Sequence, residues 1–370
     1  MAEAVFAFIY CSNLLIESMT TWLKFLAEQG AQLSVPASEE AASEVLSFGT
    51  DAYVETARDN FVAPLTHLGL IAAVGEDAAH FLHNQLTNDV EHLSVDEARL
   101  AGYCSPKGRL LASMLIWKTT DGVMLQLPRD IQAGVQKRLH MFILRAKAKL
   151  TDITQDQIML GLSGPAAATA LMPWFPILPV AIYGKVETPA GTLIRHPNAF
   201  EVPRYQWITT EAHAIEAWPP LTKILQPSGT AAWRLAEIDG GVPHITPVTQ
   251  EKFVPQMINF ELIGGVNFKK GCYPGQEIVA RSQYLGKLKR RMMHASVTAQ
   301  NAAPGTEIFS ISDPEQPCGM VVNAERSNAH EIDCLVEIKL AAAESEVRLG
   351  SATGPALSFQ PLPYPLTDPT

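Results

Sequence analysis

The most informative stretch of this sequence reads Val266-Asn-Phe-Lys-Lys-Gly-Cys-Tyr-Pro-Gly-Gln-Glu-Ile-Val-Ala-Arg281. Pro274 and Gly275 are the central pair of a type II turn, because proline presets its φ and glycine accepts the positive φ that follows. Gln276 then begins a helical run. Cys272 therefore stands just before the N-terminus of a short helix.

The surroundings of Cys272 favour its thiolate form. Unpaired N–H groups and the positive end of the helix dipole act from downstream, and Lys269 and Lys270 act from upstream. None of the other four cysteines has such neighbours in sequence. A second interpretation stays open, in which the segment is a tight structural turn with a small buried thiol. A Cys–His hydrolase mechanism would need an imidazole nearby, and His244 and His294 flank the stretch without being placed by it.

The chain as a whole has the composition of a globular protein. Its 370 residues are 47% hydrophobic and 18% charged, which excludes fibrous, disordered and collagen-like classes. A formal net charge of -10 argues against a general binder of nucleic acid or membrane surfaces, since both need a positive excess. The sequence contains no dinucleotide fingerprint, P-loop, nucleophile elbow or H-E-x-x-H.

Cysteine usage and the N-terminal region indicate a cytoplasmic protein. Five widely spaced cysteines without a C-x-x-C suggest neither a disulfide framework nor a zinc module. His80 and His83 share a helical face, but no acidic or thiolate neighbour is apparent to complete a ligand set, so we expect no metal site. The apolar stretch from Ala4 to Ile16 is too short to span a bilayer. No basic start precedes it, so we expect neither export nor a membrane partner.

The expected elements give an α+β fold class with a β appendix. The expected elements are a helix between Met19 and Gly30, a strand at 68–74, a helix at 77–85, an antiparallel meander over 99–127 and a helix at 130–141. We divide the chain into residues 1–50 (N-terminal extension, helix and linker, with 1–18 as an upstream extension), 51–150 (the first part of the first α+β domain), 151–225 (second, ferredoxin-like α+β unit), 226–291 (a segment that returns to the α+β core and carries the stretch around Cys272) and 292–370 (C-terminal β-barrel domain with a proline-rich tail).

Basic residues gather in two short stretches. Residues 129–149 and 266–291 together hold six plus seven, or thirteen, of the 28 lysines and arginines. The first stretch ends in Arg145–Leu150, where alternating basic and apolar residues predict a strand. If the two stretches converge, they form one positive site for a polycarboxylate or phosphate ligand. Two separate solvated faces explain the pattern equally well.

The signature Lys270-Gly-Cys-Tyr-Pro-Gly-Gln-Glu277 resembles the K-G-C-[YF]-x-G-Q-E motif of the YgfZ family. This family is related to the glycine-cleavage T-protein, an aminomethyltransferase, and to a mitochondrial iron–sulfur assembly factor. Further blocks resemble the same family in the same order: Thr66–Ile71, Gly75–Ala78, Phe81–Val90, Gly102–Leu110, Gly240–Pro243 and Phe253–Asn259. Together they span about residues 60–290.

The resemblance implies a three-domain ring around a central cavity for tetrahydrofolate or a one-carbon derivative, with a C-terminal β-barrel. It implies folate contacts at Tyr103 and Arg109, and less directly at Arg234 and Glu237. Cys272 becomes the essential group, within a motif formed by Lys270, Gly271, Tyr273, Gly275, Gln276 and Glu277.

One departure separates this chain from the T-protein. The T-protein places a catalytic aspartate after the glycine that corresponds to Gly108, whereas here Arg109 follows and no carboxylate is present up to Ser113. General acid or base help is typically worth about two to four orders of magnitude. Aminomethyltransferase activity should therefore be severely impaired.

By resemblance, the function is folate binding in support of iron–sulfur cluster assembly or repair, and indirectly of tRNA modification. Partners would be iron–sulfur assembly factors or their client proteins. Direct contact with tRNA is left open, since Lys287–Arg291 could reach phosphates while the overall charge opposes it. The alternatives are a folate-dependent aminomethyl or one-carbon transferase that uses another acid, and a folate-sensing scaffold in which Cys272 is structural.

Overall fold

The computed structural model describes residues 20–35, 43–49, 57–284 and 288–367. The extension expected at residues 1–18, with the thiol of Cys11, lies outside the described residues. The helix expected between Met19 and Gly30 is confirmed as α2 (Thr21–Glu28), whose N-cap Thr20 accepts a hydrogen bond from the backbone nitrogen of Leu23. A two-stranded sheet follows, made of β1 (Ala31–Leu33) and β2 (Val45–Phe48).

The first large sheet contains the expected meander. Its strand order is β5-β6-β7-β4-β8, and every neighbouring pair is antiparallel. Two helices pack against it, and α4 has an acidic first turn and a basic last turn that suit the helix dipole. The elements are β4 (Leu68–Val74), α3 (Ala78–His83), β5 (Ala98–Cys104), β6 (Leu110–Lys118), β7 (Gly122–Pro128), α4 (Arg129–His140) and β8 (Lys149–Asp152).

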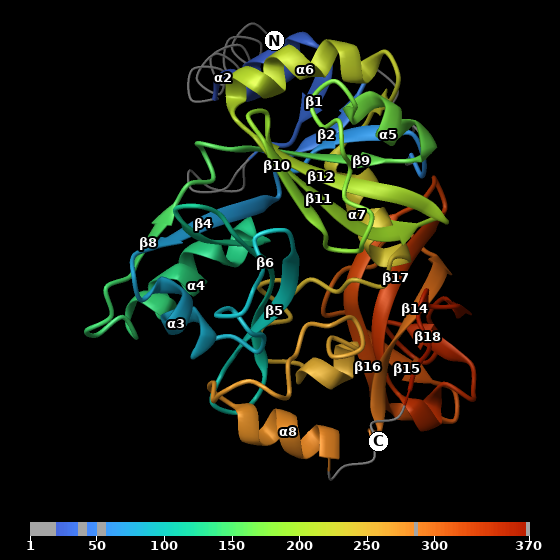
Figure 1. The fold of residues 1–370 in the computed structure, drawn as a ribbon. Coiled ribbons are helices and arrows are strands. Elements are labelled where there is room, and N and C mark those ends of the chain that lie inside the picture. Colours follow the sequence, from blue (N-terminus) through green and yellow to red (C-terminus); the bar gives the residue numbers. More distant parts are fainter. Residues whose placement is uncertain (1–19, 36–42, 50–56, 285–287, 368–370) are drawn as a thin grey trace, which may run out of the picture.

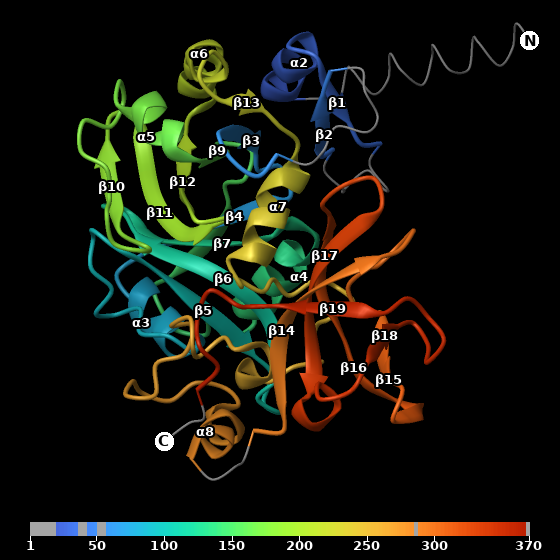
Figure 2. The ribbon, with the colours of Figure 1, turned by 90° about the vertical axis from the view of Figure 1, so that its right-hand side faces the viewer.

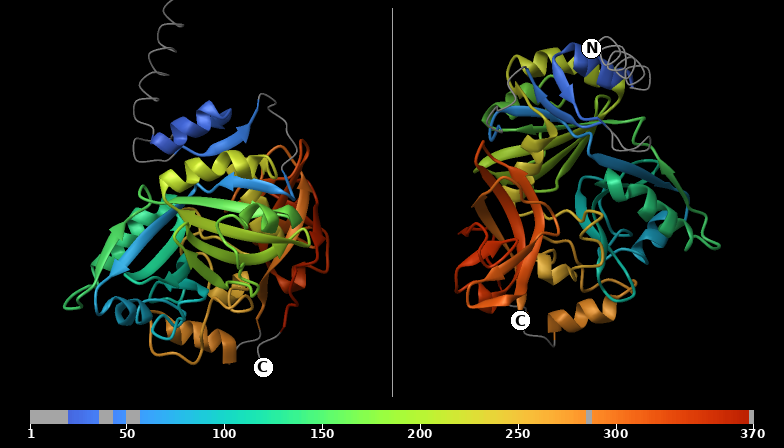
Figure 3. Two further views of the ribbon diagram at one scale, coloured as in Figure 1. Left: turned by 45° about the horizontal axis from the view of Figure 1, so that its top comes forward. Right: turned by 180° about the vertical axis from the view of Figure 1, so that it is seen from behind.

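The second sheet has the order β10-β11-β12-β9-β3-β13. Its edge strand β13 runs parallel to β3. The second sheet thus includes β3, which precedes the first sheet in the sequence, and β13, which follows α6. Figure 3 shows α2 and α6 side by side over this sheet, where Trp22 meets Trp218 edge to face. The elements are β3 (Phe61–Pro64), β9 (Ile158–Ser163), α5 (Pro165–Leu171), β10 (Lys185–Thr188), β11 (Gly191–Ala199), β12 (Val202–Thr209), α6 (Glu211–Thr222) and β13 (Gln226–Pro227).

The C-terminal sheet is curled into a half-barrel. Its order is β18-β15-β16-β17-β14-β19, and an isolated bridge between Arg348 and Ala356 brings the two edges toward each other. The barrel that the resemblance implies is thus present in this partly closed form. The elements are β14 (Arg290–Thr298), β15 (Glu307–Ser310), β16 (Asp313–Arg326), β17 (Glu331–Lys339), η2 (Leu340–Ala342), β18 (Val347–Leu349) and β19 (Leu357–Gln360).

Helix α7 (Thr230–Asp239) connects the sheets. It packs against β3 and β11 on one side and against β16 and β17 on the other, at the centre of Figure 2. Its Trp233 and Ala236 belong to a hydrophobic core that also includes residues of the first sheet and Val322 and Leu335 of the third. The expected α+β class is confirmed, and the sheets meet at this helix (Figure 1).

The expected strand at Arg145–Leu150 is wrong in its first four residues, because β8 begins only at Lys149. The backbone of Lys147 is bound elsewhere: its nitrogen donates to Asp77 Oδ2 at 2.7 Å and its carbonyl accepts from the Asp77 nitrogen at 3.3 Å. Asp77, at the start of α3, therefore binds the backbone N–H and C=O of Lys147, which a strand would need for its ladder. No helix among the described residues has the length and apolar character to cross a bilayer.

Candidate functional site

The segment that carries the signature lies along the loop after α3. Thr87 Oγ1 donates to the carbonyl of Gly265 at 2.6 Å, and Asn88 Nδ2 donates to that of Gly264 at 2.7 Å. The nitrogen of Asn267 returns a bond to the Thr87 carbonyl at 2.9 Å. These bonds bridge almost 180 residues of sequence and fix the approach to Cys272.

Lys270 fastens the signature to the same loop. Its ammonium donates to the carbonyl of His83, and to that of Leu86 at 2.8 Å, and it lies 5.0 Å from the centre of the Tyr273 ring. Burial lowers the pKa of Lys270 to about 8, although Asp89 and Cys272 act to raise it. Lys270 therefore attaches the signature to the end of α3 and the loop after it, in addition to placing a positive charge there.

The expected turn at Pro274 and Gly275 is confirmed by a φ of 79° at Gly275. This turn touches the turn between β5 and β6, where Gly108 has a φ of 68°. Helix α8 (Gln276–Tyr284) follows, and the Gln276 nitrogen donates to the Tyr273 carbonyl at 3.2 Å.

Within this framework the Cys272 side chain is exposed, as are Gly271 and Glu277, while Tyr273 is buried. The other three described cysteines are buried, and burial raises the pKa of Cys104 and of Cys334 to about 12. The interpretation of Cys272 as a buried structural thiol is therefore wrong. Among the described cysteines, Cys272 alone presents its sulfur to solvent.

A histidine cluster adjoins the signature, and sequence reasoning missed its acidic members. His83 Nδ1 lies 3.0 Å from Asp89 Oδ1, and His80 Nδ1 lies 2.7 Å from Glu91 Oε1. His92 Nδ1 is 2.9 Å from Asp89 Oδ2. The statement that no acid accompanies His80 and His83 is thus wrong, because both acids lie on the loop beyond the helix. No group with metal-binding geometry occurs among the described residues.

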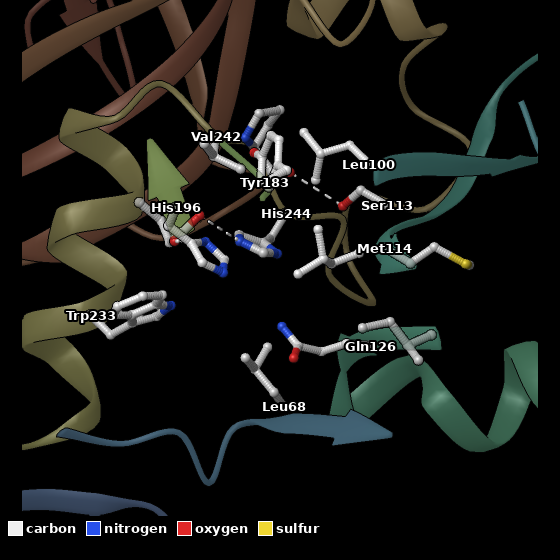
Figure 4. A pocket seen from close by; sticks show the side chains of 14 residues that line it. Leu68, Leu100, Ser113, Met114, Gln126, Tyr183, His196, Trp233, Val242 and His244 are labelled. Carbon is white, nitrogen blue, oxygen red and sulfur yellow. Dashed lines mark hydrogen bonds and ion pairs between the residues drawn. The ribbon is translucent and has the colours of Figure 1, made fainter. Parts of the chain in front are cut away.

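A small pocket, partly open to solvent, lies between the first two sheets and α7 (Figure 4). Apolar groups form much of its wall, and polar groups converge from several elements. The lining residues are Leu68, Leu100, Ser113, Met114, Leu115, Gln126, Leu127, Tyr183, His196, Trp233, Glu237, Val242, Pro243 and His244.

Glu237 of α7 is the acidic group of this pocket and is only 4% exposed. It accepts from Arg204 Nη1 at 2.7 Å, and His244 Nε2 lies 3.3 Å from its other oxygen. Burial by itself would raise the pKa of Glu237, but Arg204 and His244 outweigh burial and hold that pKa well below its usual range. The pocket therefore contains a fixed carboxylate.

Two further pocket residues carry buried polar atoms without a partner in the described part of the chain. These atoms are the Tyr183 hydroxyl and both ring nitrogens of His196. His196 Nδ1 is 3.6 Å from Glu237 Oε1, which is too long for a hydrogen bond. Burial lowers the pKa of His196, so the ring is neutral. Unpartnered buried polar groups are costly, and a polar ligand would satisfy them.

The four expected folate contacts are separated by the structure. Glu237 lines the pocket. Tyr103 is buried beside Arg138 of α4, with burial raising the pKa of its phenol. Arg109 donates to the carbonyls of Glu251 and Lys252, and Arg234 pairs with carboxylates outside the pocket.

Arg234 connects Glu44 and Glu325, each at 2.7 Å, and so ties the segment before β2 to β16. Sequence reasoning missed Gln126, Tyr183 and His196, and it considered His244 only as a partner for Cys272. Of these, His244 had a local signal, since it follows directly on the Gly240–Pro243 block.

The two basic stretches do not converge on the pocket, because none of the residues that line it is a lysine or arginine. Several of these cations are bound within the protein. Arg290 pairs with both oxygens of Glu337 at 2.8 Å, and Lys147 pairs with Glu76. Arg291 is buried against Glu261. The hypothesis of one positive site at the cavity is thus not supported.

Comparison with known proteins confirms the family resemblance. Residues 52–179 match the GCVT N-terminal domain family. The protein named tRNA-modifying protein YgfZ from Edwardsiella ictaluri is 29% identical over 81% of this chain and 93% of its own length. The protein of the same name from Photorhabdus laumondii is also 29% identical, over 81% of this chain and 91% of its own length. The fold matches the glycine cleavage system aminomethyltransferase T of Bartonella henselae with a TM-score of 0.75 at 16% identity, covering 93% of this chain and 97% of that one.

Proposed function

We propose that this chain, which resembles the YgfZ proteins along 81% of its length, binds tetrahydrofolate or a one-carbon derivative and supports iron–sulfur cluster assembly or repair, and through it tRNA modification. The observation that carries the proposal is a pocket with one fixed carboxylate and unpartnered polar atoms, within a fold shared with an aminomethyltransferase. The ring of three domains around this cavity is part of the same proposal.

The groups that line the pocket match the chemistry of the pterin end of a folate. A pterin is a flat ring with adjacent N–H donors, and a carboxylate accepts such a pair in the bidentate manner. A carboxylate has about four acceptor sites, so Glu237 keeps capacity beyond its bonds to Arg204 and His244. Trp233 and Leu100 supply apolar walls, and Tyr183 can donate its hydroxyl. The polyglutamate tail would leave the pocket, since its lining holds no cation.

Cys272 would act outside this pocket. It does not line the cavity, but β5 connects the two places: Leu100 of that strand lines the pocket, and the turn that follows the strand packs against Gly275 of the signature. An exposed thiol in a fixed loop can form a transient bond to a cluster iron or to a sulfur on a partner protein. One cysteine cannot hold a stable cluster alone.

The geometry of the pocket does not support the alternative of a folate-dependent transferase, which needs an acid to donate a proton. Glu237 is the single carboxylate among the residues that line the pocket, and Arg204 holds it ionised, so it is a poor proton donor. Turnover of methylenetetrahydrofolate with an amine acceptor would establish the transferase function.

Folate binding is tested by anaerobic calorimetric titration of the full chain with tetrahydrofolate. We expect micromolar binding that is weakened about five- to tenfold in Tyr183→Phe, which removes one neutral hydrogen bond. Arg109→Ala serves as the control and should bind as the wild type does, because this arginine lies outside the pocket. Absence of binding by the wild-type chain would remove folate from the proposal.

The role of Cys272 needs a cellular test. In a bacterial strain that lacks its YgfZ protein, this chain should restore the activity of an iron–sulfur enzyme that modifies tRNA, and Cys272→Ser should not. Cys318→Ser is the matched control, since that thiol is buried in the C-terminal sheet. Full restoration by Cys272→Ser would leave the protein as a folate-binding scaffold.

A further inference from the structure

The imidazole of His83 lies against the signature loop. Its Nε2 is 3.5 Å from the position that a Cβ on Gly271 would take, and Gly271 directly precedes Cys272. The His83 side chain is 8% exposed, and Nε2 forms no hydrogen bond with a described residue. A largely buried imidazole, whose Nε2 has no hydrogen-bond partner among the described residues, thus faces the segment that holds the exposed thiol.

The other face of this ring is fixed by acids. His83 Nδ1 lies 3.0 Å from Asp89 Oδ1 and 3.7 Å from Glu91 Oε2. An ionised carboxylate has no proton and can act only as a hydrogen-bond acceptor. In the neutral ring, Nδ1 therefore carries the proton and Nε2 is the acceptor. Asp89 is itself held by the backbone nitrogen of His92 at 3.0 Å. The arrangement has the base and the orienting acid of a proton-transfer site.

We propose that His83 is the acid–base partner of Cys272. The thiol, which forms no hydrogen bond with the ring in this structure, turns toward it across Gly271. Nε2 then takes the proton of Sγ and leaves a thiolate beside an imidazolium that Asp89 and Glu91 stabilise. The S–H bond breaks, an N–H bond forms, and the total charge does not change. No oxidant or co-reactant is needed. The thiolate is the form that attacks soft electrophiles and binds iron, so the inference deepens the proposed role of Cys272 and rests on it.

The charges that face this pair come from three elements. Helix α3 contributes His80, which is held by Glu91, and the loop beyond it contributes Asp89, Glu91 and His92. The signature contributes Lys270, whose ammonium bonds to the His83 carbonyl. Lys270 also favours a thiolate, so its effect must be separated from that of His83.

The test is the rate at which iodoacetamide alkylates Cys272 in the full-length protein, followed by mass spectrometry of the peptide between about pH 5.5 and 9. Loss of an adjacent imidazolium should lower the rate near neutral pH about tenfold in His83→Gln, which corresponds to about one unit in the pH profile. The matched control is His80→Gln, which also loses a partner of Glu91 but lies away from Gly271, and its profile should equal that of the wild type. Equal profiles for His83→Gln and the wild type would overturn the proposal.

Two further variants keep the test decisive. Asp89→Asn removes the charge behind the imidazole and should slow alkylation by several-fold with the ring still present. Lys270→Met should leave the difference between His83 and its glutamine variant intact if that difference comes from the imidazole. The outcome is independent of the cellular test: Cys272→Ser can fail to support tRNA modification while His83→Gln alkylates normally, which would reject the inference and leave the proposed function standing.

Discussion

Gly275 and Gly108 pack backbone to backbone, so that a Cβ on Gly275 would stand 2.6 Å from both the nitrogen and the Cα of Gly108. Both glycines have a positive φ. The turn that opens α8 and the turn that joins β5 to β6 therefore fit together only without side chains. This contact fixes the signature to the first sheet three residues after Cys272.

Gly275→Ala should consequently destabilise the protein by more than the cost of placing an alanine at a positive φ. A positive φ costs an alanine about 1 kcal/mol, and the backbone clash should bring the total loss in free energy of unfolding to about 2–3 kcal/mol. Gly264→Ala is the control, since its φ is 81° and nothing lies within 4 Å of the added methyl. Urea unfolding measures both, and equal losses would show that the two turns do not constrain each other.

Tyr183→Phe and Tyr364→Phe remove the same atom with opposite expected results. The Tyr183 hydroxyl is buried without a partner in the described chain, so its removal should raise the free energy of unfolding of the ligand-free protein by about 1 kcal/mol. The Tyr364 hydroxyl donates to the Gly241 carbonyl at 2.8 Å, so its removal should lower stability by about the same amount. Thermal unfolding without ligand measures both changes. Destabilisation by Tyr183→Phe would mean that its hydroxyl has a partner already.

The sequence predicted local structure well where one signal was sufficient. The buried run at 68–74, the Pro274–Gly275 turn and the helix after it are confirmed, because each depends on residues that are neighbours in the chain. The strand at Arg145 was wrong, because Asp77, seventy residues away, holds the backbone of Lys147. Alternation of residue types cannot show such a competitor.

The candidate site was predictable only in part for the same reason. Cys272 was found from its own neighbours, and Glu237 from resemblance. His196 and Tyr183 stand in stretches without a motif, and they reach the pocket only because β11 and the turn before β10 come to lie beside the first sheet. Arg109 and Tyr103 were expected at the folate cavity from their place in a block that resembles the family, yet each has another partner nearby. Side-chain direction depends on packing between elements, which the sequence alone does not reveal.

Glu237→Gln tests the fixed carboxylate. The substitution leaves Arg204 buried without its counter-charge, and breaking a buried pair costs about 3–5 kcal/mol. The pKa of Glu237 is depressed in the folded state, so its contribution to stability is fully present above the unfolded value and is lost as the pH falls through the folded value. The difference in free energy of unfolding between wild type and variant should therefore shrink as the solution is acidified below about pH 4.

Glu346→Gln is the control for this measurement, because its pair with Arg348 is partly exposed to solvent and should contribute less than about 1 kcal/mol. Urea unfolding at several pH values gives both series. A loss in Glu237→Gln no larger than in Glu346→Gln would show that the buried carboxylate is not ionised at neutral pH.

Lys270→Met tests the buried ammonium that fastens the signature. Burial lowers the pKa of Lys270 to about 8, while an unfolded lysine titrates near its ordinary value of 10.5. Between these values the unfolded state binds more protons than the folded state, so the contribution of Lys270 to stability rises with pH over this window. The slope for one proton is at most about 1.4 kcal/mol per pH unit, and partial exposure reduces it.

Lys270→Met should remove this rise of stability with pH, whereas Lys269→Met, at an exposed position, should keep it. Parallel slopes for both variants between about pH 8 and 10 would mean that Lys270 is as well solvated as its neighbour, and that its bonds to the carbonyls of His83 and Leu86 do not bury its charge.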